Sequence, residues 1–174
     1  MKVLITSGCS FTGNGYECWP EALYELLKPY GFTKLINCGL VSQGNGLISR
    51  SLMYEVVKAL KTYKPENILV GVMWSHSNRF DYRCEDPTLL SFGTTNKHGW
   101  HTNPTSFVEG TPRNWVICNS HWKSFEFETY YKYFYSEIGA SVLSLEHILR
   151  TQYFLLNKNI PYFFTNFINN NIVS

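Results

Sequence analysis

The stretch that decides the fold is KVLITSGCS, residues 2–10. Its first five residues form a short apolar, β-branched run, which predicts a strand, and the next four change abruptly to turn residues. Apolar side chains then recur at helical spacing over residues 19–30, so a helix is predicted to follow. Ser10 is therefore expected to lie in a tight turn between a strand and a helix.

The alternation of strand and helix continues along the chain. Further strands are predicted at 33–37, 67–73 and 161–167, and further helices at 47–63, 126–138 and 140–157. Such alternation is typical of parallel strands joined by right-handed crossovers, so we predict a three-layer α/β/α fold with a parallel, flavodoxin-like sheet.

One long segment departs from this alternation. Residues 75–124 are rich in Asn, Thr, Ser, Gly, Pro and aromatic residues and show no sustained period. The segment is much longer than an ordinary connection, so we predict a loop-rich insertion within a single domain, 1–174. The polar residues that follow the last predicted strand indicate that this domain lacks its C-terminal part.

Composition excludes several classes of protein. The 174 residues are 44% hydrophobic and 16% charged, as in a globular domain, and the net charge of +2 does not indicate a nucleic-acid partner. There is no apolar stretch of the ~18 residues that a membrane span needs, and no signal peptide, so a cytoplasmic protein without a membrane partner is predicted. The five cysteines are expected to be free thiols.

No metal or other cofactor is predicted either. A zinc site would have to draw on residues whose spacing matches no common ligand pattern. These residues are Cys84, His98, His101 and Cys118.

Three polar loops carry the candidate chemistry. They follow the first three predicted strands and read SGCSF (residues 7–11), CGLVSQGN (38–45) and WSHSNR (74–79). Ligands of parallel sheets bind at the carboxyl ends of the strands, so the three loops are expected to meet. Gly8 allows a sharp turn, and the amide of Ser10 at the start of a helix suits a negatively charged oxygen. The alternative is an ordinary turn in which Ser10 caps the helix.

Together the loops resemble the SGNH/GDSL hydrolase superfamily. Gly8-Cys9-Ser10 matches its first block, Asn37 aligns with the start of its second, Ser42 falls on the oxyanion-hole glycine, and Ser75 falls on the asparagine of the third. The pattern is also similar to a divergent branch found in phage and marine sequences. The resemblance implies Ser10 as nucleophile and Ser42 and Ser75 as oxyanion donors. It also implies substrate-binding roles for Gly8, Asn45, His76 and Asn78.

The sequence departs from the superfamily in two ways. Cys9 replaces the aspartate that usually precedes the nucleophile, and no Asp-x-x-His occurs in the 174 residues. His147 is predicted to be an ordinary helix residue. Because a serine without a positioned base is a weak nucleophile, the base is expected beyond Ser174, or the protein is not a working hydrolase.

Two functions are weighed most closely. The first is hydrolysis of a small-molecule or carbohydrate ester by Ser10. The second is a catalytically inactive binding or structural module for a glycan or a protein partner; the stacking candidates are Trp74, Trp100, Trp115 and Trp122. A structural virion protein and a flavodoxin-like nucleotide binder remain open as well.

Overall fold

The computed structural model describes residues 1–13, 18–83, 102–103, 115–118 and 125–166. Its main element is a four-stranded parallel sheet with the strand order β2-β1-β3-β7. The strands are β1 (Lys2–Gly8), β2 (Phe32–Asn37), β3 (Ile68–Trp74) and β7 (Tyr162–Asn166). The helices are α1 (Trp19–Leu27), α2 (Asn45–Ala59), α3 (Phe125–Tyr133) and α4 (Glu137–Asn157).

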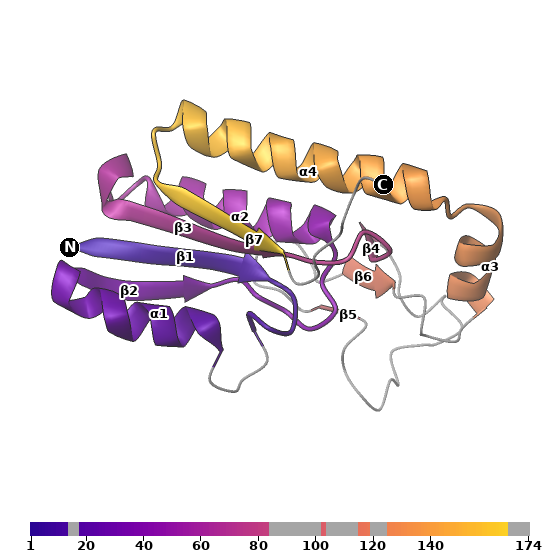
Figure 1. Cartoon of the computed structure of the whole chain (residues 1–174), viewed down its shortest axis with the longest axis horizontal. Helices are drawn as coiled ribbons and strands as arrows, with labels where there is room; N and C mark the ends of the chain where they lie inside the picture. Colours follow the sequence, from indigo (N-terminus) through magenta and orange to yellow (C-terminus); the bar gives the residue numbers. More distant parts are fainter. Residues whose placement is uncertain (14–17, 84–101, 104–114, 119–124, 167–174) are drawn as a thin grey trace.

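The helices cover both faces of this sheet, which confirms the predicted three-layer α/β/α fold. Figure 1 shows α1 on one face, with α2 and then α4 on the other. Alternation along β1 explains the two layers: Val3 and Ile5 join the main core with Leu52 of α2 and Leu155 of α4. Each such fully buried side chain stabilises the fold by about 1.5–3 kcal/mol.

The opposite face of the sheet packs around a glycine. A Cβ on Gly71 would lie 2.5 Å from the ring of Phe163 and 2.9 Å from that of Trp19. The two rings meet edge to face, with their centroids 5.8 Å apart. Gly71 therefore lets Trp19 at the start of α1 lie close against the sheet.

Local signals fix the helix boundaries. After α1, the chain makes a 3₁₀ turn, Lys28–Tyr30, and Gly31 ends it with φ 87, a conformation that favours glycine. Ser136 caps α4 by accepting a hydrogen bond from the amide of Gly139 at 3.2 Å.

A second, antiparallel sheet lies within the segment predicted to be rich in loops. It consists of β4 (Phe80–Arg83), β5 (Thr102–Asn103) and β6 (Trp115–Cys118) in the order β4-β6-β5. Strands of two to four residues are too short to show a period in the sequence, which is why they were not predicted. Figure 1 places this sheet beyond the carboxyl ends of the parallel strands.

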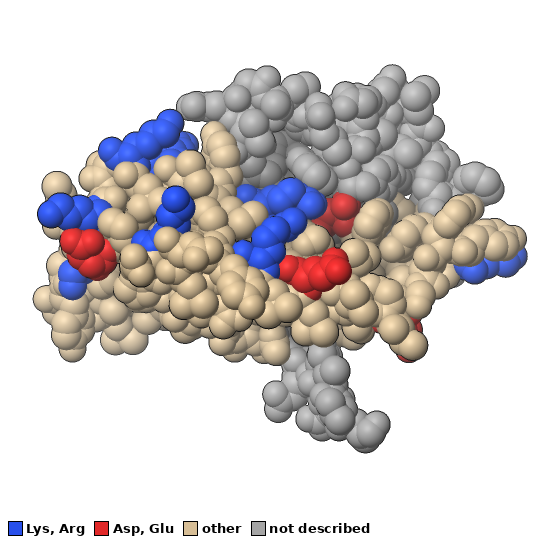
Figure 2. All heavy atoms as spheres, turned by 90° about the horizontal axis from the view of Figure 1, so that it is seen from above, with Lys and Arg blue, Asp and Glu red and all other residues tan. Residues whose placement is uncertain are grey.

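The distribution of surface charge fits the small net charge of the sequence, and three of the cysteines are unpaired. On the face drawn in Figure 2, the Lys and Arg side chains of the described residues form separate groups, without one continuous basic patch. Cys9, Cys18 and Cys38 are free thiols, as predicted, and burial raises the pKa of Cys38 to about 12. Among the described residues, no helix is both long and apolar enough to cross a membrane.

Candidate functional site

The sheet register brings the three polar loops to one rim. Gly8 of β1 pairs with Met73 of β3, and Thr6 pairs with Asn37 of β2. Because β1 lies between β2 and β3, Ser10 emerges between the loops that follow those two strands. The meeting of the loops at the carboxyl ends of the strands is therefore as the sequence predicted.

The first two loops contact each other through their backbones. The amide of Leu40 donates to the carbonyl oxygen of Gly8 at 3.1 Å. A Cβ on Gly39 would lie 2.7 Å from the amide nitrogen of Gly13, and a Cβ on Gly13 would overlap the carbonyl group of Gly39. Gly8 is enclosed too, with the carbonyl oxygen of Met73 2.8 Å from where its Cβ would stand. These glycines let the loops pack closely. The predicted contact of Gly8 with substrate stays a prediction.

Asn37 fastens the two loops together. Its Oδ1 accepts from the amide of Gly39 at 2.9 Å and from the hydroxyl of Thr6 at 3.2 Å. Its Nδ2 donates to the carbonyl oxygen of Thr12 at 2.6 Å and to the carboxylate of Glu21 at 3.1 Å. Asn37 therefore has a positioning role.

Ser10 and Ser42 both present backbone amides that are not used in the fold. Both residues are half-buried, and within the described part of the chain neither amide has a hydrogen-bond acceptor, nor does the Ser10 hydroxyl have a partner. Ser42 has φ 63. It is the third residue of a turn closed by the amide of Gln43, which donates to the carbonyl oxygen of Leu40 at 3.3 Å. That turn position favours glycine.

The substitution Ser42→Gly is expected to stabilise the protein by up to about 1 kcal/mol. A left-handed conformation costs a non-glycine residue about 1–2 kcal/mol, and glycine gives back about 0.5–1 kcal/mol as extra entropy of the unfolded chain. Denaturant unfolding measures the free energy of unfolding of two variants. Ser42→Gly should raise it, and Ser42→Val should lower it, because a β-branched residue tolerates this conformation poorly. A lower stability for Ser42→Gly would contradict the conclusion that the backbone of Ser42 is strained.

Asn45 holds the third loop against α2. Its Oδ1 accepts from the amide of Ser75 at 2.8 Å, and its Nδ2 donates to the carbonyl oxygen of Ser75 at 3.0 Å and to the hydroxyl of Ser144 at 3.1 Å. Asn45 and Ser75 are buried, and the Ser75 hydroxyl has no partner among the described residues. This hydroxyl is closed to solvent in this conformation, so the roles predicted for Asn45 and Ser75 towards substrate stay predictions.

His76 and Asn78 are tied to each other and to α3. The Nδ1 of His76 accepts from the amide of Asn78 at 3.1 Å, so the neutral imidazole carries its proton on Nε2. The hydroxyl of Tyr131 donates to the carbonyl oxygen of Asn78 at 2.6 Å. The contacts predicted between these residues and substrate stay predictions. Three further histidines lie outside the described residues: His98, His101 and His121.

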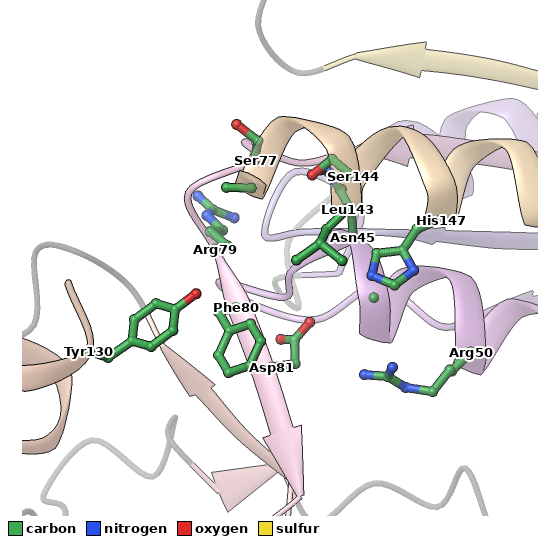
Figure 3. A pocket seen from close by; sticks show the side chains of 12 residues that line it. Asn45, Arg50, Ser77, Arg79, Phe80, Asp81, Tyr130, Leu143, Ser144 and His147 are labelled. Carbon is green, nitrogen blue, oxygen red and sulfur yellow. Dashed lines mark hydrogen bonds between the residues drawn. The ribbon is translucent and has the colours of Figure 1, made fainter. Parts of the chain in front are cut away.

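A cavity of about 230 Å³ lies beside this loop, between α2, β4 and α4 (Figure 3). The charged and polar side chains that line it include Arg50, Arg79, Asp81, Tyr130, Ser144 and His147. The lining also includes Asn45, which the sequence analysis named as substrate-binding, and Ser77, which like Arg79 belongs to the third candidate loop; the sequence analysis did not single out the others, apart from assigning His147 to a helix. These residues come from separate elements, and no local pattern connects them.

Asp81 caps α2 from a distant strand. Its carboxylate accepts from the amides of Gly44 at 3.0 Å and Leu47 at 3.1 Å, the donors left unpaired at the start of the helix. Burial raises the pKa of Asp81 to about 6, while the two amide hydrogen bonds and the guanidinium groups of Arg50 and Arg79 oppose the rise. The carboxylate is therefore ionised at pH 7, with both oxygens already bonded.

His147 faces the cavity as a neutral side chain. Burial, helped by the charges of Arg150 and Arg50, lowers the pKa of its imidazole to about 4. The Nη2 of Arg150 lies 3.2 Å from its Nδ1, and because a guanidinium can only donate, Nδ1 accepts and the proton is on Nε2. His147 lies in a helix, as the sequence predicted, and its side chain lines the cavity.

The aromatic stacking candidates are only partly described. Trp74 is 2% exposed and packs edge to face on Phe164, with the centroids 5.4 Å apart, so its prediction as a ligand-stacking residue is wrong. Strand β3 runs through the core, and its last residue points into it. Trp100 and Trp122 lie outside the described residues, and Trp115 is described only as part of β6. The same holds for the zinc candidates, of which only Cys118, also in β6, is described.

Comparison with known proteins gives limited information. No family model matches this sequence, and no curated protein matches it. Two solved structures are similar to part of it: AlinE4, a SGNH-hydrolase family esterase, and a point mutant of that esterase. Each match has 23% identity and a TM-score of 0.30, and covers 42% of this chain and 40% of the esterase chain. The chain therefore matches less than half of the esterase.

Proposed function

We propose that the protein is a serine-dependent ester hydrolase in which Ser10 is the nucleophile, acting on a small-molecule or carbohydrate ester. The observation that supports this proposal is the position of Ser10 at the carboxyl end of the central strand. There its hydroxyl and amide are unengaged within the described residues, and the adjoining loop carries the unengaged amide of Ser42. A nucleophile and two amide donors at one rim are what acyl transfer needs.

In the proposed reaction, the Ser10 Oγ attacks the carbonyl carbon of the ester. A C–O bond forms, the carbonyl oxygen becomes negatively charged, and the amides of Ser10 and Ser42 stabilise that oxygen. One such donor is typically worth about 3 kcal/mol of barrier. The hydroxyl proton passes to a base and then to the leaving alcohol as the ester bond breaks, and water hydrolyses the acyl-enzyme in the reverse sense.

The base is assigned to none of the described residues. His76 and His147 are the histidines in the described part of the chain, and both accept a hydrogen bond at Nδ1. Each neutral ring therefore carries its proton on Nε2, the nitrogen that would have to accept the proton of Ser10. His98, His101 and His121 remain as candidates within the sequence.

The variant Ser10→Ala is expected to abolish covalent labelling by a fluorophosphonate probe, because this probe reacts with an activated serine hydroxyl. Intact-mass spectrometry should show one adduct on the natural protein and on the control variant Ser141→Ala, whose serine lies on α4, and none on Ser10→Ala. Turnover of p-nitrophenyl acetate should be lost in the same variant. An adduct of equal yield on Ser10→Ala would remove Ser10 from the mechanism.

A second candidate is an inactive module that binds a ligand without hydrolysing it. The observation that favours it is that both described histidines accept a hydrogen bond at Nδ1, which leaves Nε2 to carry the proton of the neutral ring. A folded protein that neither reacts with the probe nor turns over the ester, yet binds a ligand saturably, would decide for this candidate.

A further inference from the structure

We propose that the protein forms a two-fold symmetric dimer in which the outer faces of α4 from two copies of the chain pack against each other in antiparallel orientation. The partner is thus a second copy of this chain. The surface includes neither Ser10 nor Ser42, so the proposal goes beyond ester hydrolysis and does not depend on it.

The outer face of α4 is apolar along the whole helix. Six large apolar side chains on it are between 44% and 79% exposed: Ile138, Val142, Leu145, Leu149, Tyr153 and Leu156. At 3.6 residues per turn, these six residues fall within about 80° of the helix circumference. They therefore form one continuous band, which we call the α4 stripe.

The inner face of α4 is already used within the chain. Thr151 and Leu155 are buried, and Leu155 belongs to the main core. Figure 1 shows α4 as the outermost described element on its side of the sheet, with α2 beneath it. A helix at the surface of a globular domain usually presents polar side chains to water, so an apolar outer face as well as an apolar inner face indicates a surface that another protein covers.

The order of residues in the stripe fits a reversed copy of itself. Its members recur at steps of three and four residues, as in paired helices. About a two-fold axis midway between Leu145 and Leu149, each of these leucines meets the other one of the second copy, and the two ends of the stripe also meet. Val142, the smallest member, then faces Tyr153, the largest. A parallel pair would instead place tyrosine against tyrosine and valine against valine, so the antiparallel pair packs better.

The charges beside the stripe also suit a second copy. Between Ile138 and Asn157, the sequence has one acidic residue, Glu146, and one Lys or Arg residue, Arg150. Both lie along the same edge of the stripe. In an antiparallel pair the same edges face each other in opposite directions, so two carboxylates and two guanidinium groups meet and their charges sum to zero. A membrane surface would favour a helix whose polar face is rich in Lys and Arg, which α4 lacks.

The area of the stripe is sufficient for a dimer. With about 200 Å² for a fully exposed large residue, the exposed parts of the six side chains amount to roughly 600 Å² per copy. Two copies would then bury about 1,200 Å², the lower end of the range for stable specific interfaces. We therefore expect a dissociation constant in the micromolar range, since interfaces of this size reach such affinities.

Sedimentation equilibrium over a range of protein concentrations measures the association. The natural protein should show a monomer–dimer equilibrium. Leu145→Glu and Leu149→Glu should each raise the dissociation constant about thirtyfold or more, because they bring carboxylates into the apolar contact from both copies.

Leu143→Glu is the matched control. Leu143 lies on the same helix and is 47% exposed, close to the 44% of Leu145 and the 48% of Leu149, but it lies outside the stripe. This variant should dimerise like the natural protein. Circular dichroism checks that all three variants are folded, which is expected because the three leucines are about half exposed in one chain.

Engineered cysteines test the orientation of the two helices. Ile138→Cys and Leu156→Cys place new thiols near opposite ends of α4, about 27 Å apart along one helix. Under mild oxidation, a mixture of the two variants should give a disulfide-linked dimer with one copy of each, identified by mass spectrometry. Each variant alone should give no more linked dimer than the natural protein, which controls for the natural thiols.

Three results would overturn the proposal. The first is a natural protein that stays monomeric up to millimolar concentration, whether or not it cosediments with vesicles of phosphatidylserine and phosphatidylcholine. The second is a dimer that folded Leu145→Glu and Leu149→Glu do not weaken more than Leu143→Glu does. The third is linkage of each cysteine variant to itself and not to the other, which would mean that the helices are parallel.

Discussion

The substitution Asp81→Ala is expected to lower the free energy of unfolding by about 3 kcal/mol at pH 7, since it removes one side of a buried charged group. It leaves the amides of Gly44 and Leu47 without their acceptor at the first turn of α2. Each unsatisfied buried donor costs about 1–3 kcal/mol, and burial of the carboxylate itself offsets part of that loss. Chemical denaturation measures the effect.

The effect of this substitution should depend on pH. Because the folded state raises the pKa of Asp81 from 3.8 to about 6, the native protein binds this proton more tightly than the unfolded chain does. The stability that Asp81 contributes is therefore greatest below about pH 4 and declines as the pH rises through 6. The difference between the natural protein and Asp81→Ala should shrink over the same interval.

A matched control separates the cap from a general effect of charge. Glu128→Ala removes an exposed carboxylate from α3 and should change stability by no more than about 0.5 kcal/mol. If Asp81→Ala were as mild as Glu128→Ala, the carboxylate would not be needed to begin α2.

The substitution Gly13→Ala is expected to destabilise the protein by about 2–3 kcal/mol, the cost of forcing extra atoms into a closely packed site. Its new Cβ would overlap the carbonyl group of Gly39, and backbone atoms cannot rotate away as the tip of a side chain can. The loops after β1 and β2 would have to separate. We therefore also expect weaker probe labelling of Ser10, because the amides of Ser10 and Ser42 would no longer be held in place.

Gly139→Ala is the control for this second prediction. Its Cβ would meet only the side chain of Ser136, at 3.5 Å, which is ordinary contact. Alanine in a helix is favoured over glycine by about 1 kcal/mol, so this variant should be as stable as the natural protein or more so. A loss of stability in Gly139→Ala equal to that in Gly13→Ala would show that the close contact of the two loops is not the cause.

The sequence predicted well the elements whose pattern is local. Strand β3 is a continuous apolar run because its residues are covered on both faces, and α2 is recognisable from apolar positions that recur on one side. The position of Ser10 at the end of β1 followed from the same reasoning, since parallel strands end at one edge. These features can be recognised from residues that are close together in the sequence.

The cavity could not be predicted, because it depends on contacts between distant segments. Its walls exist because α4 packs on α2, as in the hydrogen bond of 2.7 Å between the hydroxyls of Ser49 and Thr151. Asp81 meets the start of α2 although 37 residues separate it from Gly44. The positive φ of Ser42 could not be predicted either, because the serine itself gives no sign of it.

The side-chain amide of Asn45 has a mechanical consequence. It hydrogen-bonds to both the N–H and the C=O of Ser75 and to the hydroxyl of Ser144 on α4. A single planar group therefore connects the cavity wall to the loop after β3. Any displacement of α4 along α2 must either break that three-way joint or drag the loop after β3 with it. The position of α4 and the position of the loop after β3 are therefore linked through this one side chain.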